Sequence, residues 1–579
     1  MNTNSPGGDD LARGDRINAL EQALMHGKID RRHFIKLAAA LGLSAQSIDS
    51  MAQQAEAIAN NQADLARELE DQYDYIIVGA GSSGCVVASR LSENSDAKVL
   101  LLEAGGSDDV ASILNPGIWY TNLGTDREWG DKSLPQRHLN QRTLSLAMGK
   151  AMGGGSSINV MAYVRGHKND YEYWAAEAGD KAWDYQHILA IYKRIEDWQG
   201  TPDPAYRGQG GNVWVQPAKD PNPIAPAMKR AAAAIGIPSF DDHNGAMMEG
   251  PGGCSIANTS IKDGRRRNMA SHYLHPVMHR KNLTVLTQAE VQKISLSGKR
   301  ATGIEFTWQG KQRKIGARRE VILSAGALNS PKLLMLSGIG DENMLRRAGV
   351  PVRHHLPGVG QNFMDHILLG GCVWEYNVPE APRNNLAECT FFWKSDSKLD
   401  TPDLQPFQIE IPFASEATGK QYQMPQAAWS IAPGLVRPKS RGHLELQSAD
   451  WRDRLKIHAN FLSDPADLKA LVHAVELCRE IGNQPEMRQF AKREVMPGSL
   501  SRKEMENFVR NAAGTYWHET GTCKMGRDKM AVVDSQLRVR GIDGLRVADG
   551  SIMPRVTTGN TMAPCMIIGE RMAEILKQA

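Results

Sequence analysis

The chain has 579 residues, too many for one simple domain, and its 54 glycines exceed the usual share of about 7%. The net charge is only +3, no stripe of Lys and Arg interleaved with aromatics marks a nucleic-acid surface, and apolar runs stay short of the roughly 20 residues that span a membrane. We therefore expect several lobes around a large core, with no nucleic-acid partner and no transmembrane segment.

The first 71 residues differ from the rest. Arg31 and Arg32 precede a short run of small apolar residues, 37–43, which together resemble a twin-arginine export signal. We predict that residues 1–71 are a signal and linker and that the protein is periplasmic. The alternative is an amphipathic helix over 29–58 that stays on a cytoplasmic protein.

A dinucleotide-binding turn follows. Residues 74–78 form a β-branched run typical of a buried parallel strand, and they lead through Gly79, Gly81 and Gly84 into a predicted helix over 85–91. The first glycine allows the tight turn, the second lets the backbone approach a pyrophosphate, and the third lets the helix pack against the strand. Ser82 and Ser83 then stand at the helix N-terminus, where an anion binds.

A second apolar strand, 98–102, ends in Glu103. A carboxylate about 20 residues after the glycine turn binds the ribose hydroxyls of a dinucleotide, and acid at this point favours an unphosphorylated ribose. A second glycine-rich loop, 149–159, offers a row of backbone N–H donors, and one dinucleotide held at two such places implies a large cofactor. Its candidate contacts are Gly149, Gly153, Gly154, Ser156 and Asn159.

At this loop the sequence resembles the glucose-methanol-choline (GMC) oxidoreductase family. The first family signature runs through 149–159 to Tyr163 and Gly166, with one departure at Met152, where a branched aliphatic residue or Trp is usual. The second signature is complete at 326–340. Further family motifs lie at 356–366, 517–526, 547–554 and 559–564, and the resemblance covers residues 73–579.

The resemblance implies an α/β (α+β) fold. A Rossmann-like FAD-binding lobe would be built from 72–165, 225–365 and 530–579, and a substrate lobe with a mainly antiparallel sheet from 166–224 and 366–529. Residues 285–294, 304–306 and 321–324 are predicted strands by their β-branched content, and we place them in the FAD lobe.

Oxidation of an alcohol needs a base near the hydroxyl and a hydride acceptor near the carbinol carbon. The flavin is the acceptor, and a neutral histidine suits the base. The resemblance assigns this role to His518, in the Trp517-His518 motif, and places Asn560 beside it. Asn cannot act as a base, so Asn560 would hydrogen-bond the substrate oxygen.

The same motifs imply further cofactor contacts. Asn159 would lie near the flavin ring and Val291 near adenine, while Asp549 and Gly550 would lie near the pyrophosphate and ribityl chain. Thr561 and Met562 complete the set from the last motif. Some family members attach FAD through a histidine where this chain has Ile158, which has no nucleophilic atom, so we predict non-covalent FAD. His366 is interpreted as a structural hydrogen bonder at the lobe boundary, and no metal site is predicted.

Four functions remain open at this point. The first is an alcohol dehydrogenase that passes electrons to a quinone or cytochrome, and its nearest rival is an oxidase that uses O₂. A hydroxynitrile lyase with structural FAD and a non-catalytic flavin carrier are the weaker alternatives. Aromatic residues expected in the substrate lobe favour aryl, alkyl or polyether alcohols over a bare sugar: Trp374, Tyr376, Phe391, Phe392, Trp393, Phe407, Phe413 and Trp429.

Overall fold

The computed structural model describes residues 17, 20, 23–24, 29–41 and 43–578, so most of the first 28 residues of the predicted signal lie outside it. Arg31 begins helix α2 (Arg31–Ala40), and its guanidinium pairs with Asp49 at 3.1 Å and Glu56 at 3.0 Å, both on helix α3 (Ala45–Arg67). Near its C-terminal end α3 is tied to the main body, because the Gln62 amide donates to the Leu283 carbonyl at 2.9 Å and accepts from the Val285 N–H at 2.9 Å.

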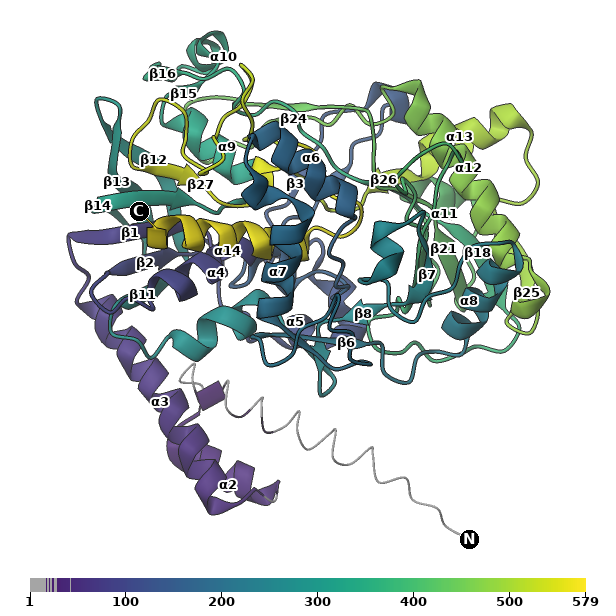
Figure 1. Ribbon diagram of the computed structural model, residues 1–579, viewed down its shortest axis with the longest axis horizontal. Helices are drawn as coiled ribbons and strands as arrows, with labels where there is room; N and C mark the ends of the chain where they lie inside the picture. The colour runs from purple at the N-terminus through teal and green to yellow at the C-terminus, as the bar shows by residue number, and fades with distance from the viewer. Residues whose placement is uncertain (1–16, 18–19, 21–22, 25–28, 42, 579) are drawn as a thin grey trace.

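A seven-stranded sheet forms the first lobe (Figure 1). The parallel part is built from β11 (Leu283–Leu286), β2 (Val99–Leu102), β1 (Gln72–Val78), β14 (Lys311–Leu323) and β27 (Leu545–Val547). Two antiparallel strands, β13 (Arg300–Trp308) and β12 (Ala289–Ser297), extend the sheet beyond β14. The strand predicted over 285–294 is thus two strands, β11 and β12, separated at Gln288, whose φ is 53°.

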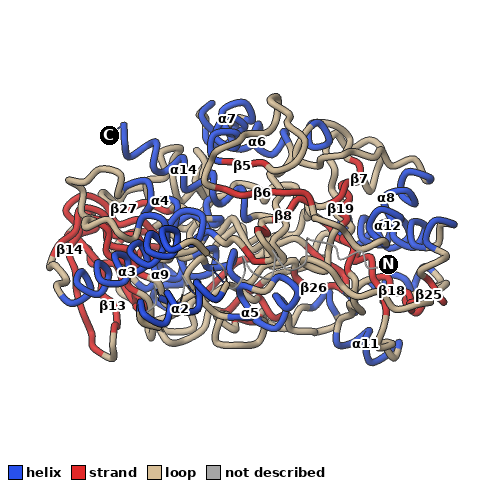
Figure 2. The backbone as a smooth tube through the Cα atoms, turned by 90° about the horizontal axis from the view of Figure 1, so that it is seen from below, coloured by secondary structure: helices blue, strands red, loops and turns tan. Residues whose placement is uncertain are grey.

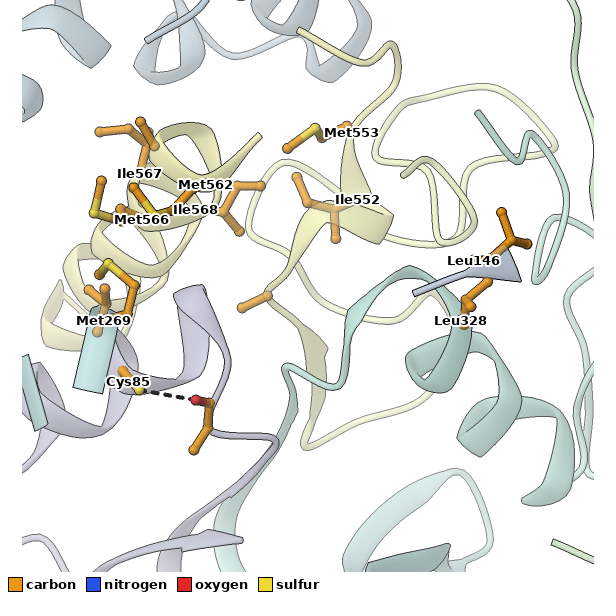
Figure 3. Packing of buried hydrophobic residues seen from close by; sticks show 14 of the residues in the cluster. Cys85, Leu146, Met269, Leu328, Ile552, Met553, Met562, Met566, Ile567 and Ile568 are labelled. Carbon is orange, nitrogen blue, oxygen red and sulfur yellow. Dashed lines mark hydrogen bonds between the residues drawn. The ribbon is translucent and has the colours of Figure 1, made fainter. Parts of the chain in front are cut away.

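Helix α14 (Met562–Gln578) packs along helix α4 (Ser82–Leu91), although the two lie at opposite ends of the chain (Figure 1). The contact is close at Gly569, where an added Cβ would meet the Ser83 carbonyl oxygen at 2.8 Å. Figure 3 shows the apolar side chains of α14 that pack near Cys85, with the Cys85 thiol directed at the Ala80 carbonyl at 3.1 Å. This packing places the start of α14 next to the first glycine turn.

A six-stranded, fully antiparallel sheet forms the second lobe. Its order is β25 (Ala491–Met496), β18 (Cys372–Tyr376), β21 (Ala428–Ala432), β20 (Phe407–Ile409), β19 (Cys389–Phe392) and β7 (Gly253–Ile256). Helices α8 (Ile224–Ala234), α12 (Pro465–Gly482) and α13 (Arg502–Ala512) lie with this lobe, and the two sheets stand at opposite ends of the molecule (Figure 2). The predicted fold class is confirmed.

A small three-stranded sheet contributes directly to the site. Strand β17 (Ile367–Leu369) pairs antiparallel with β26 (Ala513–Thr515) on one side and with β22 (Gly434–Leu435) on the other. Further helices of the described chain are α5 (Ala111–Leu114), α6 (Lys168–Ala178), α7 (Tyr185–Ile195), α9 (Gly326–Leu336), α10 (Glu342–Arg347) and α11 (Glu416–Tyr422). Further strands are β3 (Asp131–Lys132), β5 (Glu196–Trp198), β6 (Val213–Pro217), β8 (Asn258–Thr259), β15 (Ile339–Gly340), β16 (His354–His355), β23 (His443–Glu445) and β24 (Lys456–His458). In the part of the chain described here, no helix is both long and apolar enough to cross a membrane.

Candidate active site

The glycines of the first turn are required by contact. Gly79 has φ 101°, and a Cβ there would meet the Ser324 carbonyl oxygen at 2.5 Å. A Cβ on Gly84 would meet the Gly79 carbonyl oxygen at 1.9 Å, so any larger residue would push α4 away from β1. The turn therefore has the close helix–strand packing that a dinucleotide fold needs.

The second glycine loop touches the first. Gly154 has φ 55°, and a Cβ on it would meet the Cα atom of Gly81 at 2.7 Å. The N–H of Gly153 donates to the Ala80 carbonyl at 2.8 Å. Two loops that lie about 70 positions apart in the sequence thus form one backbone-lined wall, as expected if both hold the same ligand.

Glu103 lies at the end of β2 with its carboxylate held by backbone. One carboxylate oxygen accepts from the Ala80 N–H at 2.9 Å and the other from the Gly105 N–H at 2.8 Å. Burial outweighs these hydrogen bonds and raises the pKa of Glu103 to about 7. The side chain faces the cavity with lone pairs still available for ribose hydroxyls.

One long cavity joins these loops to the second lobe, with an empty volume of about 2070 Å³ that includes space open to solvent. Most residues predicted to contact the cofactor line this cavity, whereas Gly84 and Gly153 lie behind its wall and shape it. The predicted residues on the wall are Gly79, Gly81, Ser82, Ser83, Glu103, Gly149, Gly154, Ser156, Asn159, Val291, Asp549, Gly550, Asn560, Thr561 and Met562, together with His518.

Asp549 is fully engaged by protein donors. Its carboxylate accepts from the Gly326 N–H at 2.9 Å, the Ser330 hydroxyl at 2.5 Å and the Ser551 N–H at 2.8 Å. It therefore joins the start of α9 to the segment after β27, and this fixes the cavity wall near Gly550.

His518 and His366 are brought together by the pairing of β17 with β26. The two strands run antiparallel, and the Tyr516 N–H donates to the His366 carbonyl at 3.0 Å just beyond the paired residues. The side chains then meet, with Nδ1 of His366 2.9 Å from Nδ1 of His518. His366, interpreted from the sequence as a structural hydrogen bonder at the lobe boundary, thus contacts the imidazole of the predicted base.

The backbone of His518 is also fixed. Its N–H donates to the Asp365 carboxylate at 2.9 Å, and the Thr515 hydroxyl donates to the second oxygen of that carboxylate. The imidazole stacks on the Tyr516 ring with centroids 5.0 Å apart and planes 14° apart. Burial lowers the pKa of His518 to about 3, so its imidazole is neutral in the working range of pH.

Hydrogen bonds on either side of His518 define its tautomer. Gln405 donates its amide N–H to Oδ1 of Asn560 at 3.1 Å, which leaves the Asn560 amide nitrogen facing Nε2 of His518 at 3.3 Å. In this arrangement Nε2 accepts a hydrogen bond, so the proton is on Nδ1, where His366 accepts it. The nitrogen that faces the cavity side is therefore the unprotonated one that a general base requires.

The cavity wall around these residues is apolar. Tyr516 packs with a cluster made of Ala162, Leu368, Ala387, Phe407, Ile409 and Ala432, against which Val160, Ile411 and Phe413 also pack. Of the eight aromatics proposed from the sequence, only Phe407 and Phe413 line the cavity. Trp374 and Trp429 instead stack on each other in the core of the six-stranded sheet, with ring centroids 4.5 Å apart.

Sequence reasoning missed several residues of this site. Asp365 and Gln405 are buried beside His518 and Asn560, and Glu519 lines the cavity with both carboxylate oxygens buried and without a hydrogen-bond partner among the described residues. Asp365 lies inside the family motif at 356–366, and this position was the one indication in the sequence that it belongs to the site. Nothing in the local sequence around Gln405 marks it.

The comparisons with known proteins agree with this geometry. Models of the GMC oxidoreductase family match residues 73–368 and 438–569. The chain belongs to the GMC oxidoreductase family. It is 38% identical to mouse mitochondrial choline dehydrogenase over 88% of this chain and 90% of the relative, and 37% identical to an alcohol dehydrogenase [acceptor] of Pseudomonas putida over 87% and 95%.

A solved structure of pyridoxine 4-oxidase from Mesorbium loti superposes with a TM-score of 0.83 at 33% identity, covering 88% of this chain and 99% of that one. As a GMC oxidoreductase the protein is an FAD-binding flavoprotein. The two glycine loops, Glu103 and the backbone-lined wall fit that cofactor, and the chemistry that FAD supplies is acceptance of a hydride.

A different cluster lies on the hairpin β23–β24. His443, Glu445 and His458 have ligand atoms within 4.8 Å of one another, a grouping that sequence spacing did not show. The two imidazoles stack with centroids 4.2 Å apart, and Arg347 approaches the Glu445 carboxylate at 3.8 Å. The sequence-based absence of a metal site stays a prediction.

Proposed function

We propose that the protein oxidises an apolar primary alcohol to an aldehyde, with His518 as general base and a quinone or cytochrome as the electron acceptor. The observation that carries the proposal is the neutral, hydrogen-bonded His518, whose unprotonated Nε2 meets the Asn560 amide at the cavity. FAD supplies the hydride acceptor at this wall.

The roles of the residues follow from their contacts. Asn560, oriented by Gln405, donates a hydrogen bond to the alcohol oxygen and holds it beside Nε2 of His518. His518 takes the hydroxyl proton at Nε2, which leaves an imidazolium whose Nδ1–H remains bonded to His366. General-base catalysis of this kind contributes roughly 10²–10⁴-fold to the rate.

The substrate class rests on the cavity wall. The cluster around Tyr516 consists of aliphatic and aromatic side chains. The carboxyl of Glu519 also lines the cavity, but burial raises its pKa well above the ordinary value and so favours its neutral form. An alkyl or aryl alcohol buries apolar area against the cluster, whereas a sugar would leave several hydroxyls without partners. We therefore propose aryl and medium-chain alkyl alcohols ahead of choline, although choline dehydrogenases are among the relatives.

O₂ is the alternative acceptor, and the similarity to a pyridoxine oxidase favours it as the second candidate. The preference for a quinone or cytochrome rests on the twin-arginine-like segment and on the relative named alcohol dehydrogenase [acceptor]. Turnover with a redox dye compared with peroxide release separates the two. Peroxide formation as fast as dye reduction would overturn the preference.

The central test is anaerobic bleaching of the bound flavin by a panel of aryl alcohols, alkyl alcohols, choline and sugars. His518→Ala should retain FAD and lose roughly 10²–10⁴-fold in the reduction rate. His355→Ala, at an exposed histidine on β16, is the matched control and should reduce at the native rate. A fully active His518→Ala protein would refute the assignment.

A further inference from the structure

Arg266 differs from the other buried arginines. Four arginines are buried in the described chain, and three of them pair with a glutamate: Arg165 and Arg207 with Glu196 at 2.6 and 2.8 Å, and Arg546 with Glu320 at 3.0 Å. Among the residues that the structure describes, no carboxylate forms an ion pair with Arg266, which is 2% exposed.

The guanidinium of Arg266 contacts only neutral oxygens. Nε donates to the Ile113 carbonyl at 2.7 Å, and Nη1 donates to the Ser156 carbonyl at 3.0 Å and to Oδ1 of Asn159 at 2.6 Å. Nη2 is buried and has no hydrogen-bond partner in the described chain. Burial alone lowers the pKa of Arg266 to about 9, which leaves it charged at neutral pH.

A buried charge without a counter-charge costs several kcal/mol unless another group compensates it. If Arg266 served only to bind three oxygens, a neutral donor would do so at lower cost. The position therefore indicates a negative partner that arrives with the cofactor.

Asn159 connects Arg266 to the cavity. Its Oδ1 accepts from both Arg266 and the Met161 N–H, the latter at 2.9 Å, so its amide nitrogen is the group left to face outward. That nitrogen lies 3.3 Å from the Met562 sulfur, and Asn159, Ser156 and Met562 all line the cavity. The positive charge thus stands directly behind the wall predicted to hold the flavin ring.

We propose that Arg266 is a fixed positive charge that stabilises the flavin when it becomes negatively charged, acting through the amide of Asn159. This inference rests on the proposed function. Alcohol oxidation moves two electrons and one proton to the flavin as a hydride and one proton to His518, so the ring gains one negative charge. A cation fixed behind the ring makes the cofactor a stronger oxidant, because it stabilises the product of that transfer.

The test measures the flavin without any alcohol. Sulfite adds to flavin N5 and leaves a negative charge on the ring, so its dissociation constant reports the positive charge nearby. Arg266→Gln, which keeps donors but removes the charge, should weaken sulfite binding about tenfold and lower the two-electron midpoint potential by about 30 mV, the equivalent of that factor. Arg266→Lys should restore most of both.

Two further variants guard against a purely structural effect. Asn159→Asp keeps the size of the residue and sets a carboxylate against Arg266, so it should also weaken sulfite binding about tenfold in a protein that folds normally. Arg267→Gln removes the neighbouring half-buried charge and should leave the sulfite constant unchanged. Native sulfite affinity in FAD-loaded Arg266→Gln or Asn159→Asp would overturn the proposal. If the variants change sulfite affinity as expected but no alcohol bleaches the flavin of the native protein, the result would instead count against the proposed function.

Discussion

Gln405 offers a sharp test of how Asn560 is oriented toward His518, the two residues of the proposed catalytic pair. Its amide N–H donates to Oδ1 of Asn560 at 3.1 Å, and both side chains are buried. Gln405→Leu removes the donor and leaves the Asn560 oxygen without it, at a cost of about 1–3 kcal/mol for an unsatisfied buried acceptor. Rotation of the Asn560 side chain toward another donor then becomes favourable. This rotation moves the amide nitrogen away from His518 and from the substrate oxygen.

If the full cost of about 1–3 kcal/mol destabilises the orientation in which the Asn560 amide nitrogen faces His518, the limiting rate of anaerobic flavin reduction should drop about 5- to 150-fold. Stopped-flow reduction over a range of alcohol concentrations measures this rate and separates it from substrate affinity. Gln408→Leu is the matched control, because Gln408 is equally buried but accepts from the backbone N–H groups of Glu388 and Cys389 at 2.6 and 3.0 Å.

Gln408→Leu should lower the stability of the protein, but its folded, FAD-loaded fraction should keep the native limiting rate of flavin reduction. A native limiting rate in Gln405→Leu would show that Asn560 is oriented by something else. An equal drop in both variants would show that the effect is general damage to the sheet and not loss of this hydrogen bond.

Three further predictions concern the cofactor and pH. Because Ile158 has no nucleophilic atom, acid precipitation should leave a colourless pellet and yellow supernatant, and colour retained in the pellet would contradict dissociable FAD. Ribose hydroxyls favour the ionised form of Glu103, whose pKa is about 7 in the free protein. The affinity for FAD should therefore rise with pH, by at most about tenfold per pH unit, up to about pH 7 and then level off. Glu103→Gln should abolish this pH dependence in a fluorescence titration. With the pKa of His518 lowered to about 3, the reduction rate should show no protonation step between pH 8 and 5, where an ordinary histidine would lose activity.

Some requirements of the first glycine turn are local and can be read from the sequence. Gly84 is needed for its contact with Gly79 within one strand–turn–helix unit, and Glu103 follows the next strand directly, whereas the close neighbour of Gly79 is Ser324, just after the distant strand β14. The family motifs placed His518 and Asn560 by position alone. What they could not supply was the orientation of either side chain.

The surroundings of His518 depend on long-range pairing. His366 lies 152 positions away and reaches His518 only through β17 and β26, two strands of three residues each. Strands so short carry little periodicity, so their register is not readable from the sequence. The aromatic residues illustrate the same limit, because the stacking of Trp374 on Trp429 is set by the register of β18 against β21.

Glu519 adds an argument about the substrate. Burial raises the pKa of this cavity-lining carboxyl well above its ordinary value and so favours its neutral form. A cationic substrate such as choline would favour the ionised form of Glu519, but both the buried cation and the new carboxylate would lose solvation. A neutral alcohol enters without that cost and can use the protonated carboxyl as a hydrogen-bond donor. The neutral form of Glu519 thus supports the same proposed substrates as the apolar cluster around Tyr516.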